Sequence, residues 1–136
     1  MKEFDEIDEL TLFALGLYGE CRSEKIDAKV AHASAIWNRH NNARKSLREV
    51  LLTPKHFSCF NEGDPNLNEI RKARDSDKKN AAYRECYWAA YGVMFGYLRD
   101  NTGGADHYNT VNVDPAWDDK MVKTAQFGKT EFFREA

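Results

Sequence analysis

Apolar residues recur with a helical period near the N-terminus, from Asp5 or Asp8 to about Cys21. At about 100° per residue, five of them fall on one side of a helix within about 100° of one another. They are Leu10, Ala14, Leu17, Tyr18 and Cys21. Early acidic residues suit the positive end of the helix dipole. The pattern therefore predicts a first helix with one buried stripe.

Glu20 lies at the edge of that stripe, near Phe13. A helical side chain leans over the turn before its own Cα, so Glu20 should cover Gly16, which has no side chain to fill the space. We expect a notch there, beside the acid. If the helix buries Glu20 beside Phe13, desolvation should raise the pKa of Glu20 and suit it for general acid chemistry. The same pattern also fits a solvated Glu20 and a Gly16 that serves helix packing.

The next segments also show helical patterns. Residues 27–40, with Asp27 as N-cap and many small side chains, predict a second helix that packs antiparallel to the first. Residues 46–52 predict a short helix with Ser46 as cap and Glu49 at its third position. Range 54–75 shows no period and predicts a long loop. Range 77–100 predicts the longest helix, at the centre of the core, ended by turn residues at 101–104.

The C-terminal part changes character. Range 105–113 is rich in residues suited to strands, and ranges 121–126 and 130–133 flank a turn at 127–129. A chain of 136 residues fits one domain. We therefore predict a single α+β domain over residues 1–136, mainly helical, with a small C-terminal β-hairpin or sheet.

Composition excludes several classes of function. A formal net charge of -2 gives no general attraction to nucleic acid or to an anionic membrane. The longest uncharged run, 86–98, is too short to cross a bilayer, and the acidic N-terminus does not resemble a secretory signal. We expect a monomer that is made in the cytoplasm without an export signal and does not insert into membranes.

Three widely spaced cysteines, Cys21, Cys59 and Cys86, argue against a disulfide framework and against a zinc site. His32 and His40 are too far apart along a helix to share a metal ion without further ligands. We expect free thiols, no metal and no cofactor.

Candidate chemistry is spread along the chain. Glu24 would share a face with Glu20 if the helix continued, as in paired-carboxylate glycosidases, but a break near residue 23 makes it a residue that flanks the helix end. His107 and Tyr108 follow a glycine turn, and such polar aromatic pairs serve either packing or sugar recognition. Two other aromatic residues fit the same two interpretations, namely Phe57 and Trp117.

Cys59 and His107 are also a possible nucleophile and base of a thiol peptidase, because such pairs are distant in sequence and close in space. No third group that would orient the histidine is evident in the sequence.

Taken together, several short strings resemble, in order and spacing, the cell wall hydrolases of the spore-cortex-lytic SleB and CwlJ type. They are YGECRSE at 18–24, AIWNR at 35–39, FSCFN at 57–61, GADHYN at 104–109, Val113-x-Pro115-x-Trp117 and FGKTEFFR at 127–134. The resemblance implies a lysozyme-like domain that cleaves peptidoglycan glycan between N-acetylmuramic acid and N-acetylglucosamine.

Carried onto this chain, the resemblance implies a lytic transglycosylase with Glu20 as its sole catalytic carboxylate. Glu20 would protonate the leaving oxygen and then, as a base, assist attack by the muramic 6-hydroxyl, which gives a 1,6-anhydro product. The segments Phe57-Ser58 and His107-Tyr108 would line the sugar groove.

The chain also departs from the family pattern. Cys21-Arg22-Ser23 stands where Ala-Arg-Gly is usual, and Asp106-His107-Tyr108-Asn109 stands where Thr-His-Tyr-His is usual. Asp106 is therefore a candidate second carboxylate, which leaves hydrolysis by water open as an alternative outcome.

The lack of a signal or wall-binding domain suggests a phage lysis protein that reaches the wall after holin-type release. A thiol peptidase or amidase that uses Cys59, and a non-catalytic wall-binding module, are the alternative functions.

Overall fold

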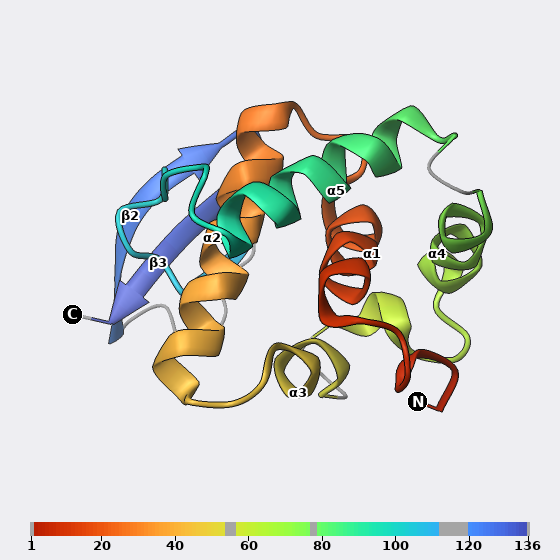
Figure 1. Ribbon diagram of the computed structural model, residues 1–136. Coiled ribbons are helices and arrows are strands. Elements are labelled where there is room, and N and C mark those ends of the chain that lie inside the picture. The colour runs from red at the N-terminus through yellow and green to blue at the C-terminus, as the bar shows by residue number, and fades with distance from the viewer. Residues whose placement is uncertain (1, 54–56, 77–78, 112–119, 136) are drawn as a thin grey trace.

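The computed structural model describes residues 2–53, 57–76, 79–111 and 120–135 and shows a helical body with a small antiparallel sheet at one side (Figure 1). The elements, in order, are η1 (Lys2–Phe4), α1 (Glu9–Cys21), α2 (Ile26–Ala43), α3 (Leu47–Leu52), η2 (Ser58–Phe60), α4 (Pro65–Asp75), α5 (Ala81–Met94), β1 (His107–Thr110), β2 (Met121–Phe127) and β3 (Thr130–Glu135). The predicted α+β, mainly helical class is confirmed.

Helix α1 is the central helix of the body. Its buried residues face every direction, because α2, α3, α4 and α5 all pack against it. They are Leu12, Phe13, Ala14, Leu15, Gly16, Leu17, Tyr18, Gly19 and Cys21. The predicted single stripe is therefore wrong: α1 is apolar nearly all round, which is typical of a helix inside a core.

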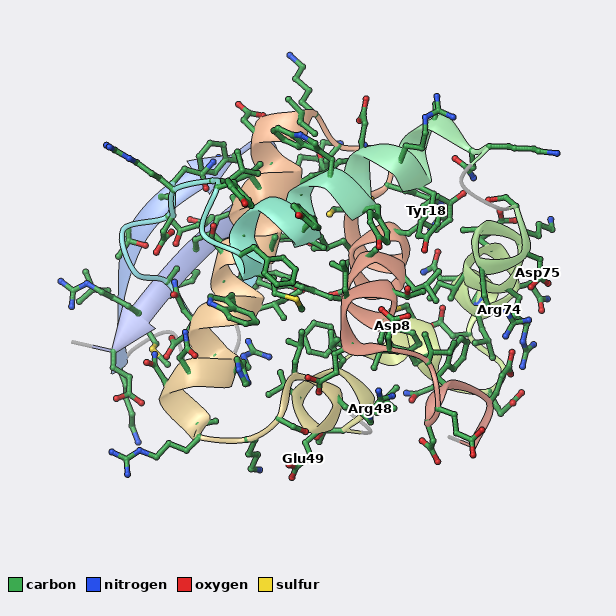
Figure 2. The ribbon with its side chains drawn as sticks, in the orientation of Figure 1. Asp8, Tyr18, Arg48, Glu49, Arg74 and Asp75 are labelled. Carbon is green, nitrogen blue, oxygen red and sulfur yellow. The ribbon has the colours of Figure 1, made fainter. Side chains whose placement is uncertain are left out.

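The start of α1 is fixed by polar contacts (Figure 2). The Asp8 carboxylate accepts a hydrogen bond from the Thr11 N–H at 2.9 Å, as an N-cap does. Arg48 of α3 donates to the Phe4 carbonyl at 2.9 Å and also to the Ile7 carbonyl. These bonds hold the segment before α1 against α3.

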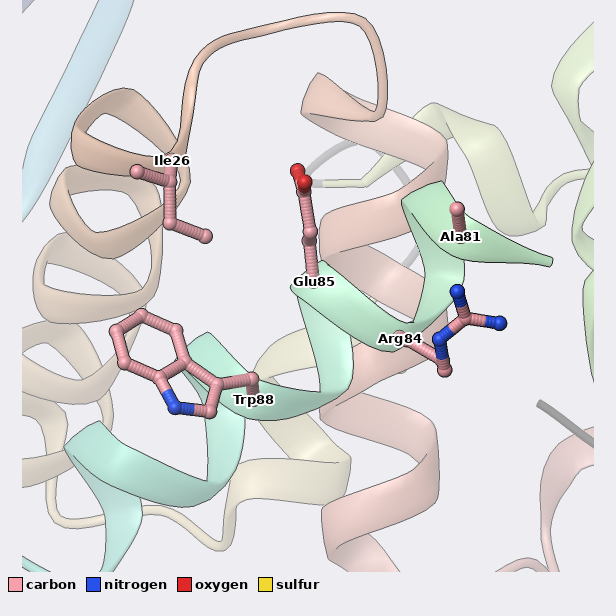
Figure 3. A pocket seen from close by; sticks show the side chains of 5 residues that line it. All are labelled: Ile26, Ala81, Arg84, Glu85 and Trp88. Atoms are coloured by element: carbon pink, nitrogen blue, oxygen red, sulfur yellow. The ribbon is translucent and has the colours of Figure 1, made fainter. Parts of the chain in front are cut away.

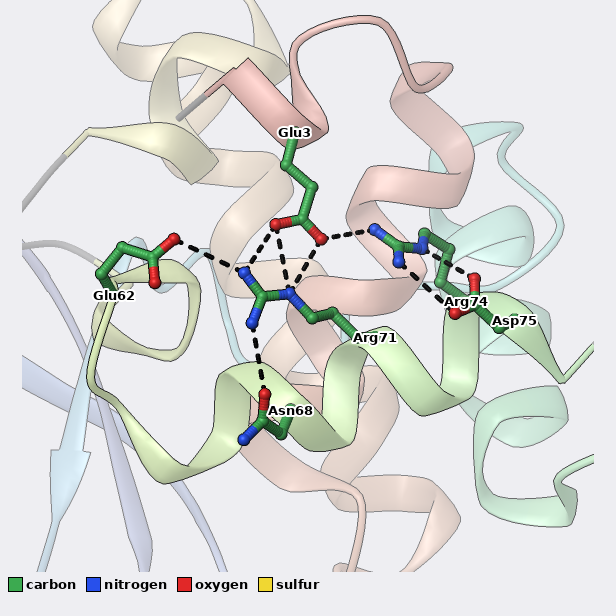
Figure 4. Close-up of polar contacts among 6 residues, drawn as sticks. All are labelled: Glu3, Glu62, Asn68, Arg71, Arg74 and Asp75. Atoms are coloured by element: carbon green, nitrogen blue, oxygen red, sulfur yellow. Dashed lines mark hydrogen bonds and ion pairs between the residues drawn. The ribbon is translucent and has the colours of Figure 1, made fainter.

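The first turn of the chain is also tied to α4 (Figure 4). The Glu3 carboxylate accepts from Arg71 at 2.7 Å and from Arg74 at 2.6 Å. The hydrogen bond from Arg71, together with the bond from Arg74 and both positive charges, lowers the pKa of Glu3 to about 2. Because the folded pKa is lowered, this contribution to stability is present above the unfolded pKa and is lost as the pH falls toward 2.

Helix α2 runs opposite to α1 (Figure 1), and Phe13 stacks on Trp37 with ring centroids 6.3 Å apart, which confirms the predicted antiparallel pair. Its predicted bounds are wrong at both ends. The N-cap is Lys25, while Asp27 lies inside the first turn. The helix continues past His40 to Ala43. Its last turn is held by Asn42, which donates a hydrogen bond to the Asp106 carboxylate at 3.0 Å.

The short helix α3 agrees with its prediction. Ser46 accepts from the Glu49 N–H at 3.1 Å, and Glu49 accepts from the Ser46 N–H at 3.2 Å, so the capping box is complete.

The predicted long loop at 54–75 is wrong for the residues that the structure describes there, since η2 and α4 occupy most of them. Asp64 caps α4 by accepting from the Asn66 N–H at 2.8 Å, and Pro65 takes the first helical position. Three residues on one side of α4 are buried, namely Leu67, Ile70 and Ala73. This narrow apolar face packs α4 against α1.

Helix α5 lies across α1 and α2 (Figure 1) and is shorter than predicted. It begins at Ala81, with Asn80 accepting from the Tyr83 N–H at 3.2 Å, and ends at Met94. The end falls before Gly96, which has a φ of +79° that other residues rarely adopt. With 14 residues α5 is not the longest helix, because α2 has 18.

The sheet has the order β1-β3-β2, with all neighbours antiparallel. The predicted hairpin is confirmed as β2 and β3, which join at Gly128 in the left-handed region (φ +56°). Phe132 of β3 packs on the small residues Ala31 and Ala35 of α2. Tyr108 of β1 pairs with Phe132, so β1 lies beside the same helix.

Within the described ranges, the helices lack the length and apolar character that a membrane crossing needs. The three cysteines are free, as predicted, and all three are buried.

Candidate functional site

Glu20 lies in the last turn of α1 and meets Tyr108 of β1. The Tyr108 phenol donates a hydrogen bond to Glu20 Oε1 at 2.7 Å. Burial raises the pKa of Glu20 above its usual range; the bond from Tyr108 and the charge of Arg39 oppose this shift only in part. The Glu20 carboxyl therefore keeps its proton to higher pH than a solvated glutamate does, and the Tyr108 phenol beside it is a neutral hydrogen-bond donor.

The packing around the glycines next to Glu20 differs from the prediction. A Cβ atom placed on Gly16 would come 3.1 Å from Leu51 and 3.5 Å from Phe60, so no notch is open there. At Gly19 the approach is closer still: a Cβ would lie 2.7 Å from Cys59 Cβ and 2.8 Å from Ile70 Cδ1. The absence of a side chain at Gly19 therefore lets η2 and α4 pack tightly against the turn that carries Glu20.

Tyr108 is held in place by aromatic neighbours. The His32 ring meets it edge to face at a centroid distance of 4.7 Å, and Phe132 lies at 5.7 Å. His32 Nδ1 donates to the Ala28 carbonyl at 2.8 Å, and burial lowers the pKa of His32, which favours the neutral ring. Burial, with the nearby Glu20, raises the pKa of the Tyr108 phenol, so the phenol keeps its proton for the bond to Glu20.

Asp106 connects β1 to α2. Its Oδ2 accepts from Asn42 at 3.0 Å, and its Oδ1 accepts from His107 Nδ1 at 2.9 Å. Its backbone carbonyl accepts from Arg39 Nε at 2.8 Å. The side chain is buried, and both carboxylate oxygens are engaged in these contacts. Asp106 therefore fixes the strand that carries Tyr108.

The segment at 57–58 divides into a buried and an exposed residue. Phe57 is only 1% exposed, and the Arg39 guanidinium lies over its ring at 5.8 Å from the centroid. Its ring is thus part of the core in this structure and offers no surface on which a sugar could stack. Ser58 is exposed. Trp117, the other predicted aromatic contact, lies outside the described residues.

Glu24 follows the end of α1 at Cys21, as the predicted helix break requires. It lies beside the turn between β2 and β3, where its Oε2 would be 3.4 Å from a Cβ placed on Gly128. It is therefore not on a continuing helical face with Glu20.

The Cys59 thiol has the environment of a structural cysteine. The side chain is buried, and burial, with the negative charges of Glu20 and Asp64, raises its pKa. A nucleophilic cysteine needs the opposite shift. Among the described residues, moreover, no three potential metal ligands are grouped together.

On the prediction from the sequence that Glu20 is the catalytic acid, replacing Tyr108 by Phe should lower the rate of peptidoglycan cleavage by about 10–100-fold, because the carboxyl of Glu20 loses the bond that orients it. The pKa of Glu20 should also rise further, since the lost bond lowers it. The alkaline limb of the pH–rate profile, where the acid loses its proton, should accordingly move to higher pH. A Tyr108→Phe variant with an unchanged profile would show that the bond does not act on the reacting group.

Three comparisons with known proteins bear on this geometry. The model of the Cell Wall Hydrolase family matches residues 23–133, which is more than half of the chain and begins just after Glu20. A search of curated proteins finds no match.

Two solved structures share the fold. The catalytic domain of the Bacillus cereus SleB protein has a TM-score of 0.69 and 22% identity, over 93% of this chain and 89% of that one. The catalytic domain of the germination-specific lytic transglycosylase SleB from Bacillus anthracis has a TM-score of 0.69 and 21% identity, over 96% and 98%. The length and position of the family match show that the chain belongs to the cell wall hydrolase family, a family of peptidoglycan-degrading enzymes.

Proposed function

We propose that this enzyme cuts the glycan strand of peptidoglycan between N-acetylmuramic acid and N-acetylglucosamine, with Glu20 as acid and then base. The observation that carries the proposal is the partly buried Glu20, whose raised pKa and 2.7 Å bond from Tyr108 suit a general acid. The B. anthracis protein with the same fold is described as a lytic transglycosylase, which favours the same reaction class.

In the first step, protonated Glu20 gives its proton to the glycosidic oxygen, and the bond from that oxygen to C1 of the muramic residue breaks. The resulting carboxylate is stabilised by the Tyr108 phenol and by the positive charge of Arg39. In the second step, the carboxylate takes the proton of the muramic 6-hydroxyl while the oxygen of that hydroxyl bonds to C1. Glu20 is then protonated again, and the product is a 1,6-anhydro sugar. One carboxylate suffices because the substrate supplies the nucleophile.

Hydrolysis by water is the alternative, with Asp106 as the base that activates the water. The position of Asp106 makes this the weaker candidate, because it is buried and its two oxygens accept from Asn42 and His107. We therefore favour the anhydro product.

Mass spectrometry of digested peptidoglycan tests the proposal. We expect muropeptides that end in anhydro-muramic acid and are one water lighter than the products of hydrolysis. Muramic acid with a free reducing end would instead indicate hydrolysis. Free stem peptides that disappear in a Cys59→Ser variant would indicate the thiol peptidase, and binding without release of any fragment would indicate a wall-binding module. That the protein reaches the cell wall through a membrane lesion and that it is a monomer stay predictions.

A further inference from the structure

Helix α5 exposes a row of aromatic side chains. The Trp88 side chain is 51% exposed and Tyr97, just after the helix, is 75% exposed. Tyr91 and Phe95 lie between them in sequence and are also exposed. Of the six large hydrophobic residues that are exposed in the described part of the chain, five belong to this region, with Ile26 of α2 as the fifth. A concentration of this kind marks a surface that binds something.

The surface contains hollows rather than a flat patch. A hollow of about 470 Å³ lies between the start of α2 and α5 (Figure 3). Two others, of about 370 and 320 Å³, follow along α5. Trp88 lines all three, Arg84 lines the first and the third, and Tyr91 lines the second and the third, so the hollows adjoin one another along α5. We call them together the aromatic track. Its main lining residues are Ile26, Arg84, Glu85, Trp88, Tyr91 and Tyr97.

Several of these side chains are held in position. Lys29 is only 2% exposed, and its Nζ donates to Glu85 Oε1 at 2.6 Å, which fixes this carboxylate at the edge of the first hollow. The rings of Tyr91 and Tyr97 are parallel, with centroids 5.9 Å apart. The backbone N–H groups of residues 97 and 98 both donate to the Gly92 carbonyl, at 2.8 and 2.9 Å. A rigid surface loses little conformational entropy when it binds a ligand.

The chemistry of the track fits sugar rings. Indole and phenol rings offer apolar faces to the C–H side of a pyranose, while their N–H and O–H tips, with Arg84 and Glu85, can bond to hydroxyl and acetamido groups. Among the described residues, Arg84 is the one cationic side chain that lines the three hollows, since Lys29 is buried against Glu85; a single exposed cation is far fewer than the cluster of basic residues that binds an anionic lipid surface. A series of adjoining hollows along a helix fits a linear polymer of sugar units better than a single small molecule.

The track is separate from Glu20. Its lining residues include none of the groups that surround Glu20. On α1, Tyr18 faces α5, where its ring meets Tyr83 at 6.1 Å, whereas Gly19 faces Cys59 of η2. We propose that the aromatic track is a second binding surface for the glycan strand, which keeps the enzyme on the wall between cuts. This inference rests on the proposed function only in taking the same polymer as its ligand.

Binding measurements in the Glu20→Gln background test the track without cleavage. One protein carries only Glu20→Gln, a second adds Trp88→Ala and Tyr97→Ala, and a third adds Val122→Ala, a matched exposed hydrophobic residue on β2. Each is titrated with purified sacculi and with glycan strands stripped of stem peptides. We expect the track variant to bind both about tenfold more weakly or worse, because loss of exposed aromatic anchors costs more than loss of other contacts. The Val122 variant should bind as its parent does.

Equal binding by the track variant and its parent would overturn the proposal. Binding that requires stem peptides would also overturn it. So would a track variant that loses self-association in sedimentation velocity but keeps glycan binding, or a track that binds phosphatidylglycerol vesicles in place of glycan. If the Glu20→Gln protein still released fragments, the proposed function would fail, but the relative binding of the two variants would still decide the role of the track.

Discussion

The Glu20→Gln variant is expected to release soluble fragments from peptidoglycan about 10²–10⁴-fold more slowly than the wild type. Glutamine keeps the shape of the side chain and can still accept the bond from the Tyr108 phenol, but it has no proton to give to the leaving oxygen. Release of labelled fragments from purified sacculi measures the rate, and thermal unfolding checks that the fold is intact.

Stability provides a second readout for the same variant. Burial raises the folded pKa of Glu20, so the neutral form contributes stability at low pH that is lost as the pH rises through the folded pKa. Glutamine never ionises, and the variant should therefore gain stability relative to the wild type as the pH rises. Glu69→Gln on α4 is the control: its carboxyl lies outside the site and makes an exposed ion pair with Lys72, so the rate should stay unchanged and the stability should change little. Wild-type activity in the Glu20→Gln protein would refute the assignment.

Gly19→Ala should destabilise the protein by about 1–3 kcal/mol and lower its activity as well. The added Cβ would lie 2.7 Å from Cys59 Cβ and 2.7 Å from its Sγ, far inside the normal contact distance between such atoms. Cys59 Cβ is attached directly to the backbone of η2, so the clash can be relieved only if η2 or α1 moves. The helix propensity of alanine exceeds that of glycine by only about 1 kcal/mol and does not offset this strain.

The matched control is Gly16→Ala, one turn earlier on the same helix. There the nearest atom, at 3.1 Å, is a terminal methyl of Leu51, which can rotate away. Denaturant unfolding should therefore rank Gly16→Ala well above Gly19→Ala in stability, and fragment release should rank them in the same order. Equal stabilities would show that η2 does not pack against α1 as closely as described.

Local signals predicted best the two helices whose capping residues adjoin a clear apolar pattern. The helices α1 and α3 were found because Asp8, Ser46 and Glu49 lie next to clear apolar patterns. Helix α4 was missed because its sequence is mostly polar and follows a stretch rich in Asn, Gly and Asp. The pair Asp64-Pro65, followed by apolar residues at intervals of three, is the signal that would have found it.

The site depended more on the resemblance than on periodicity. Glu20 and Tyr108 were both selected, but the bond between them joins residues 88 positions apart and follows from how β1 packs on α2. His32, Arg39 and Asn42 were missed as site residues because they lie on a helix rich in alanine, where local spacing does not reveal which strand will lie alongside. The raised pKa of Glu20 agrees with the expectation that desolvation would raise it, whereas the notch predicted at Gly16 is filled by Leu51 and Phe60.

Because α1 is covered on every side, the proposed catalytic acid sits on an element that few local fluctuations can move. Opening the last turn of α1 would require α5, α4 and η2 to separate from it together, which is close to unfolding the whole domain. Thermal inactivation should then follow global unfolding instead of preceding it. We therefore expect a change in activity to come from access of the substrate to Glu20 more readily than from local unfolding around it.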